Sequence, residues 1–164
     1  MKFLLKSLAL LIALSLLYVT PPAGAADGGV TSTLKSSRIV RAGDGTEKHL
    51  PAERASAGDV VEYLLVYKNT SRGPIKNLLA TLPVPSGMTL VEKSANPPTA
   101  TFSADGKAYS EAPVHRKVTD AAGHPRREMV PQAEIRFLRW MVTKLGPGES
   151  CTLTARVRVN GPTH

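Results

Sequence analysis

Apolar and polar residues alternate strictly near the C-terminal end of the sequence, over residues 151–159. One side of this segment carries Cys151, Leu153, Ala155, Val157 and Val159, and the other carries Thr152, Thr154, Arg156 and Arg158. A period of two predicts a β-strand with one buried and one solvent-facing side. An apolar run precedes it, and Gly146-Pro147-Gly148 separates the two. Because such breaks are typical of hairpin turns, we expect the two segments to pair as antiparallel strands.

Short apolar runs separated by Pro and Gly recur along the rest of the chain. The expected strands are 33–41, 60–69, 75–82, 88–94, 99–103, 107–110, 132–142 and 151–159, with a short edge piece within 47–56. Asp105-Gly106 predicts a tight hairpin between two of them. This spacing predicts an all-β, antiparallel β-sandwich of about seven to eight strands, with Trp140 in its core.

One long segment, residues 111–131, does not fit this pattern. It is polar, it contains three Pro and one Gly, and only its stretch 114–118 has weak strand character. Loops longer than about 15 residues are uncommon and are often mobile or functional. We therefore expect an irregular excursion from the sandwich.

The first 25 residues have the pattern of an export signal. Lys2 and Lys6 precede an apolar run over 8–19, and Ala23-Gly24-Ala25 fits a small-residue cleavage site. The run is shorter than the about 20 residues that span a membrane. We expect a signal peptide at 1–25, a flexible leader at 26–32 and one domain at 33–160, exported to the periplasm or the medium. No membrane span is expected after cleavage.

The single cysteine excludes an internal disulfide within the chain. Cys151 lies on the apolar side of its strand, so we interpret it as a small buried hydrophobe rather than a reactive or intermolecular thiol. Ala26 stands where a bacterial lipoprotein would need its anchoring cysteine.

The chain is basic, with a net charge of +8, and removing the two Lys of the signal peptide leaves +6. A positive charge favours acidic partners such as anionic glycans, although acidic residues are interspersed and ordinary solubility also explains it. The candidate anion-binding residues are Arg126, Arg127, Arg156 and Arg158. Their alternative role is to protect strand edges against aggregation. Because aromatic residues are only 5% of the chain, no platform for stacking bases is visible and no nucleic acid is expected.

No catalytic or cofactor-binding motif is present. The four histidines, His49, His115, His124 and His164, have no metal-ligand spacing with one another. Aspartates beside glycine, such as Asp59 and Asp105, are explained by turns rather than by calcium. Asn69-Thr70-Ser71 fits a glycosylation sequon, which we interpret as coincidence. We expect no enzyme activity, no metal and no cofactor.

Four pieces of the sequence occur in an order that is found in a known family. They are residues 58–69, 82–90, 138–140 and 145–150, the last leading into the alternating segment. Together they resemble the bacterial conserved repeat domain, an immunoglobulin-like module of exported and surface proteins also called domain of unknown function eleven. The resemblance implies an immunoglobulin-like sandwich without catalysis, and it carries over no functional residue. The chain departs from the family in having one copy and the 111–131 insertion.

The function expected from these observations is a non-catalytic, exported structural or protein-interaction module of the bacterial cell envelope, with envelope or surface proteins as partners. The alternative is a polyanion- or glycan-binding β-sandwich domain that uses its surface arginines.

Overall fold

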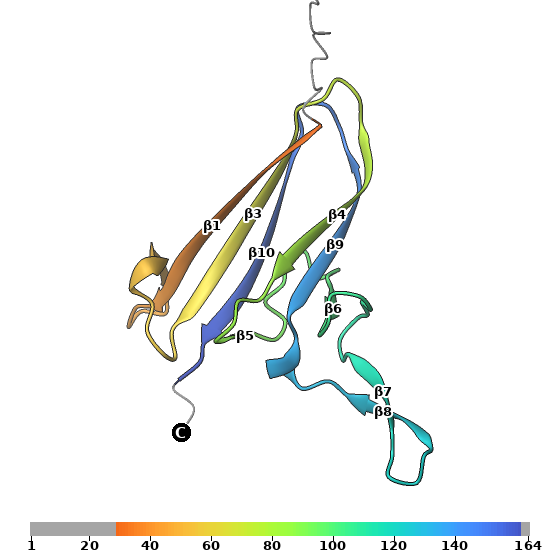
Figure 1. Ribbon diagram of the computed structural model, residues 1–164. Coiled ribbons are helices and arrows are strands. Elements are labelled where there is room, and N and C mark those ends of the chain that lie inside the picture. Colours follow the sequence, from red (N-terminus) through yellow and green to blue (C-terminus); the bar gives the residue numbers. More distant parts are fainter. Residues whose placement is uncertain (1–28, 162–164) are drawn as a thin grey trace, which may run out of the picture.

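A computed structural model describes residues 29–161, which form ten strands and two short 3₁₀ helices (Figure 1). The strands are β1 (Val30–Arg41), β2 (Glu47–Pro51), β3 (Val60–Asn69), β4 (Ile75–Pro83), β5 (Met88–Leu90), β6 (Thr101–Ser103), β7 (His115–Thr119), β8 (Pro125–Met129), β9 (Phe137–Leu145) and β10 (Ser150–Val159). The 3₁₀ helices are η1 (Ala52–Arg54) and η2 (Gln132–Glu134). In this part of the chain no helix is long and apolar enough to cross a membrane.

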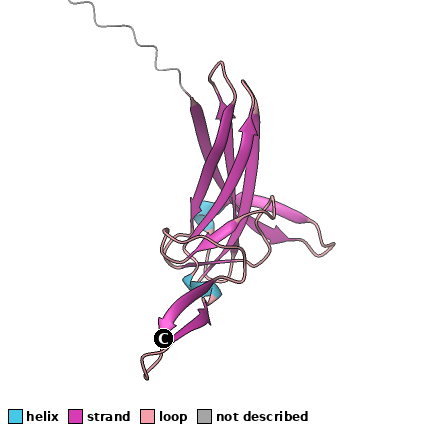
Figure 2. Ribbon diagram, turned by 90° about the vertical axis from the view of Figure 1, so that its right-hand side faces the viewer, coloured by secondary structure: helices cyan, strands magenta, loops and turns pink. Residues whose placement is uncertain are grey.

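Two antiparallel sheets pack face to face, as Figures 1 and 2 show. The first has five strands in the order β2-β1-β3-β10-β5, and the second has three in the order β4-β9-β6. These eight strands confirm the predicted all-β antiparallel sandwich. The remaining two, β7 and β8, pair only with each other and form a two-stranded ribbon that protrudes from the sandwich (Figure 1).

The core lies between the sheets and contains the side chains that the alternation predicts. Leu153 and Val157 of β10 are buried, and they lie opposite Leu65 and Val61 of β3 in the register of the sheet. From the second sheet, Trp140 contributes an indole that is 1% exposed. Its N–H donates to the carbonyl of Pro97 at 2.9 Å, so the one polar atom of the ring is satisfied.

The prediction of a C-terminal hairpin is wrong. β9 pairs with β4 and β6, whereas β10 pairs with β3 and β5, so residues 146–149 connect the two sheets instead of joining neighbours in one sheet. Both strands carry a strongly apolar side, and the two sides face each other across the core. Alternation reports which side of a strand is buried, but it does not report which strand is its neighbour.

A buried asparagine ties this connection to the one between β3 and β4. The Asn69 amide nitrogen donates to the carbonyls of Gly73 at 2.8 Å and Leu145 at 2.9 Å. Its side-chain oxygen accepts the backbone N–H of Ser71 at 2.9 Å, a bond within its own turn. Because Asn69 is 0% exposed and its amide donates twice, the side chain is inaccessible to a glycosyl donor.

Two of the predicted boundaries are wrong. Residues 30–32, expected in a flexible leader, already belong to β1, where Val30 pairs with Asn69. Residues 132–134, expected to begin the Trp-bearing strand, form η2, and β9 begins only at Phe137. The predicted signal peptide and the leader residues 26–28 lie outside the described residues.

The strand expected at 107–110 is reduced to one bridge, between Phe102 and Ser110. The turn before it closes around Asp105, whose carboxylate accepts the backbone N–H groups of Lys107 at 2.8 Å and Ala108 at 3.2 Å. The Asp-Gly pair therefore makes a turn, as predicted, but the strand after it is not extended.

The segment 111–131, expected to be irregular, contains β7 and β8. The register runs from His115 opposite Met129 to Thr119 opposite Pro125. Backbone hydrogen bonds hold the two strands together, and both faces of the ribbon are largely polar. Because neither face is buried in the core, the segment has no apolar alternation, and this absence made it resemble a loop.

Candidate binding site at the base of the ribbon

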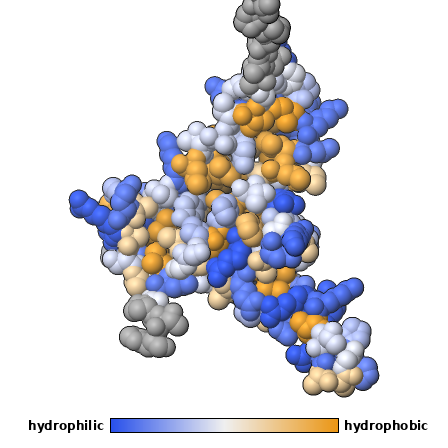
Figure 3. Space-filling model, viewed as in Figure 1, coloured by the Kyte–Doolittle hydropathy of each residue, from blue (hydrophilic) through white to orange (hydrophobic). Residues whose placement is uncertain are grey.

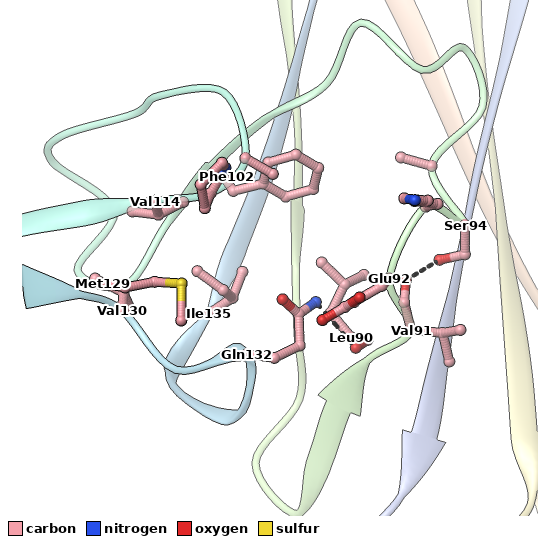
Figure 4. Close-up of a pocket in the computed structure, with 14 residues that line it drawn as sticks. Leu90, Val91, Glu92, Ser94, Phe102, Val114, Met129, Val130, Gln132 and Ile135 are labelled. Carbon is pink, nitrogen blue, oxygen red and sulfur yellow. Dashed lines mark hydrogen bonds between the residues drawn. The ribbon is translucent and has the colours of Figure 1, made fainter.

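An apolar groove with a volume of about 320 Å³ lies where the ribbon leaves the sandwich (Figure 4). One wall is formed by the end of β5 and residues 91–95, and the other by residues 112–114 and 129–130 on either side of the ribbon. Ile135 and Phe102 also line it. Concave, mostly apolar sites of roughly 300–1,000 Å³ are typical of ligand pockets.

The walls of the groove are fixed by the core. Val114 and Val130 are both buried, and the N–H of Val130 donates to the carbonyl of Val114 at 2.8 Å, which closes the base of the ribbon. Across the groove, the side-chain amide of Gln132 donates to the carbonyl of Leu90 at 3.1 Å. Met129, which also lines the groove, is 61% exposed. The groove therefore has a buried floor and an apolar outer edge.

One face of the ribbon is neutralised by ion pairs. Arg116 contacts the carboxylates of Glu128, at 2.8 Å, and Glu134, and Arg126 lies 3.4 Å from Glu128. Hydrogen bonding from Arg116 holds the pKa of the Glu128 carboxyl below its ordinary value. The cations of this face are engaged with the protein's own acids.

The opposite face of the ribbon is cationic. Lys117 lies directly opposite Arg127, and both are exposed. The next pair toward the sandwich on this face is His115 and Met129, and no acidic residue belongs to the face. Neither Lys117 nor Arg127 has an ion-pair partner within residues 29–161. Figure 3 shows hydrophilic surface along the ribbon, with apolar surface near its base. We call Lys117 and Arg127 the cationic row.

The four predicted anion-binding arginines do not form one site. Arg126 and Arg127 point to opposite faces of the ribbon. Arg156 and Arg158 lie on β10 in the five-stranded sheet, away from the protruding ribbon (Figure 1). Only the register of the ribbon places Lys117 opposite Arg127.

Arg156 holds three strands of the five-stranded sheet together. Its guanidinium donates to both carboxylate oxygens of Glu47, at 3.1 and 2.7 Å, and to Glu62 at 2.9 Å. These contacts join β2 and β3 to β10. Hydrogen bonding from Arg156, and then from Arg41, lowers the pKa of the Glu47 carboxyl from 4.5 to about 2. Arg158 donates to the carbonyl of Gly58 at 2.9 Å.

Other side chains that could do chemistry are held in structural contacts. Burial raises the pKa of the Cys151 thiol, which disfavours the nucleophilic thiolate. His49 lies 3.7 Å from Glu62, and His124 lies 3.7 Å from Asp120, whereas His164 lies outside the described residues. Within residues 29–161, no three His, Cys, Asp or Glu side chains are grouped so as to hold a metal ion.

Comparison with known proteins adds no homologue, because no family model, curated protein or solved structure matches the chain. The function therefore has to be argued from the geometry of the residues themselves.

Proposed function

We propose that this chain is a non-catalytic interaction module that is exported to the bacterial cell envelope and binds a protein partner at the base of its ribbon. The observation that carries the proposal is the ribbon itself. It protrudes from the sandwich, pairs with no other strand of residues 29–161, and presents an exposed methionine beside an apolar groove (Figures 1 and 4). Export is supported by the pattern of residues 1–25.

The surface has the composition of an interaction site. An apolar centre surrounded by polar residues is typical of protein interfaces, and methionine and arginine are enriched there. Met129 supplies an adaptable apolar side chain, and Lys117 and Arg127 supply a polar rim. Arg156, by contrast, is engaged in holding the sandwich together.

The second candidate function is polyanion or glycan binding. The cationic row favours it, because it leaves two positive side chains without acids to neutralise them. Binding to heparin would then weaken steeply as salt is raised, since exposed charges are screened within about 10 Å at 0.1 M. Salt-insensitive binding, or none, would exclude this alternative.

Site-specific photo-cross-linking tests the preferred function. A photoreactive amino acid is placed at Met129, and in a control at Thr143, which is exposed on β9 away from the groove. The tagged full chain is expressed in the exporting bacterium, and adducts are identified by mass spectrometry. We expect one reproducible protein adduct from position 129 and none from 143. Equal adducts from both positions, or none from 129, would contradict the proposal.

N-terminal sequencing of the exported chain tests the predicted cleavage of the signal peptide. The first residue found should be Ala26.

A further inference from the structure

We infer that the ribbon and groove take an extended, acidic segment of a partner protein, with an apolar side chain in the groove and carboxylates on the cationic row. This inference rests on the proposed function and specifies the chemistry of the partner. Three features of the site carry it: the apolar groove, the unpaired charge of the cationic row, and the free edges of the ribbon.

The groove selects an apolar side chain. Its floor is made of core residues such as Leu90 and Ile135, which are 4% and 3% exposed, so the side chains of the floor offer no hydrogen bond to a polar group that enters it. At one rim, the neighbouring Glu92 and Lys93 carry opposite charges and leave no net charge there. The rim thus adds no charge preference of its own.

The cationic row selects negative charge. Like charges directly opposite each other across two strands are destabilising, and Lys117 and Arg127 have this arrangement with no acid on their face. The other face of the same ribbon shows that acids are available, because Glu128 neutralises Arg116 and Arg126 there. A partner carboxylate on the cationic row would relieve the repulsion and form charge-assisted hydrogen bonds.

The free edges of the ribbon favour an extended chain over a small anion. Among the described residues, β7 and β8 pair only with each other, so each has one edge of unpaired backbone groups that a third strand can join. Side chains on one face of a strand repeat every two residues, about 6.6–6.8 Å. On β8, Met129 at the groove and Arg127 of the cationic row have this same spacing. A partner segment in which an acidic residue follows two residues after an apolar residue therefore fits the site. The apolar residue lies at the groove and the acidic residue lies on the cationic row.

A second copy of this chain is a poor occupant of the edge. Pairing of two ribbons in a symmetric register would bring a second Lys117 and Arg127 against the first pair, and this repulsion disfavours self-pairing. An acidic strand meets no such barrier. The cationic row thus protects the edge against the wrong strand and accepts a partner of opposite charge.

Nuclear magnetic resonance titration of the mature chain tests the inference. The probe is acetyl-Ser-Thr-Leu-Thr-Glu-Thr-Glu-Ser-amide, whose Leu and two Glu lie on one face when extended. We expect shifts in residues 112–130 and saturable binding. Two changes should each weaken binding about tenfold or more: the Lys117→Glu/Arg127→Glu variant, and a peptide with Gln in place of both Glu. Met129→Ser should also weaken it.

The matched control is Lys76→Glu/Lys144→Glu. These two lysines are exposed and also lie directly opposite each other, but on β4 and β9 and not among the residues that line the groove. The variant makes the same change in net charge and should bind the peptide like the wild type. Equal weakening of peptide binding by both charge variants would show a general charge effect and would overturn the assignment of the binding site to the cationic row.

Two other results would overturn the inference. One is the absence of peptide binding by the wild type. The other is binding of dodecyl phosphate, but not the peptide, in the groove, which would assign an amphiphile in place of a protein segment. If position 129 cross-links to a protein while the peptide fails, the proposed function stands and only the acidic-segment inference falls. If position 129 gives no adduct, the proposed function itself falls.

Discussion

Asn69 shows how one side chain can set a connection between sheets. Its amide spans two turns that are far apart in sequence, since Gly73 and Leu145 both accept its hydrogen bonds. The turn within residues 69–73 was predictable because asparagine commonly bonds the backbone two residues on. The bond to Leu145 was not, because it depends on where β9 ends in space.

At the same scale, Trp140 is expected to dominate the stability of the core. Trp140→Ala should lower the free energy of unfolding by about 3–5 kcal/mol, because it removes the largest fully buried side chain and leaves a cavity between the sheets. Urea titration followed by circular dichroism measures this. The control is Met141→Ala, whose side chain is 61% exposed and whose loss should change the value by less than about 0.5 kcal/mol. Equal effects of the two substitutions would contradict the assigned core.

At the scale of elements, the ribbon is an appendage of the sandwich. Its strands pair only with each other, and the ion pair between Arg116 and Glu134 is an exposed contact to the adjoining η2. Such pairs contribute about 0–1 kcal/mol. The ribbon is therefore positioned by the sandwich without being needed to hold it together.

Excision of the ribbon tests this independence. Replacing residues 115–129 by Gly-Gly leaves Val114 and Val130, which are already hydrogen-bonded at 2.8 Å, joined by a two-residue turn. We expect the free energy of unfolding in urea to change by no more than about 1 kcal/mol, while binding at the groove is lost. A loss of more than about 3 kcal/mol would show that the ribbon belongs to the folding core.

At the scale of the whole molecule, one ion cluster links distant parts of the chain. Glu47 and Arg156 are separated by 109 residues, and their contact fastens β2 across the five-stranded sheet to β10. Since β2 is an edge strand, this cluster holds the periphery of the sandwich in place. It also makes the fold sensitive to acid.

The pKa of Glu47 fixes the direction of that sensitivity. Its pKa is lowered in the folded state from 4.5 to about 2, so its ionised form stabilises the fold above pH 4.5. This stabilisation is lost as the pH falls from 4.5 toward 2. We expect the difference in unfolding free energy between wild type and Glu47→Gln to be largest near neutral pH and to shrink through that window.

Urea titrations at several pH values measure the difference directly. Glu111→Gln is the control, because Glu111 is exposed and has no ion-pair partner within the described residues. The difference in unfolding free energy between wild type and Glu111→Gln should not change between pH 4.5 and 2 in the same way. A pH-independent difference for Glu47→Gln would mean that the contact to Arg156 does not stabilise the fold.

The sequence alone determined which side of the C-terminal strand is buried. Alternation in residues 151–159 reports burial locally, because side chains of a strand point to opposite faces. It also determined the turns at Asn69 and Asp105, since these side chains bond their own backbone. All of these are decided within a few residues.

Only the tertiary structure decided which strands are neighbours and which charges remain free. β9 and β10 are adjacent in sequence but lie in different sheets, and Arg156 is neutralised by Glu47, which lies 109 residues earlier in the chain. The cationic row exists because the ribbon register places Lys117 against Arg127. Pairing and charge neutralisation depend on contacts between distant segments, and no local pattern encodes them.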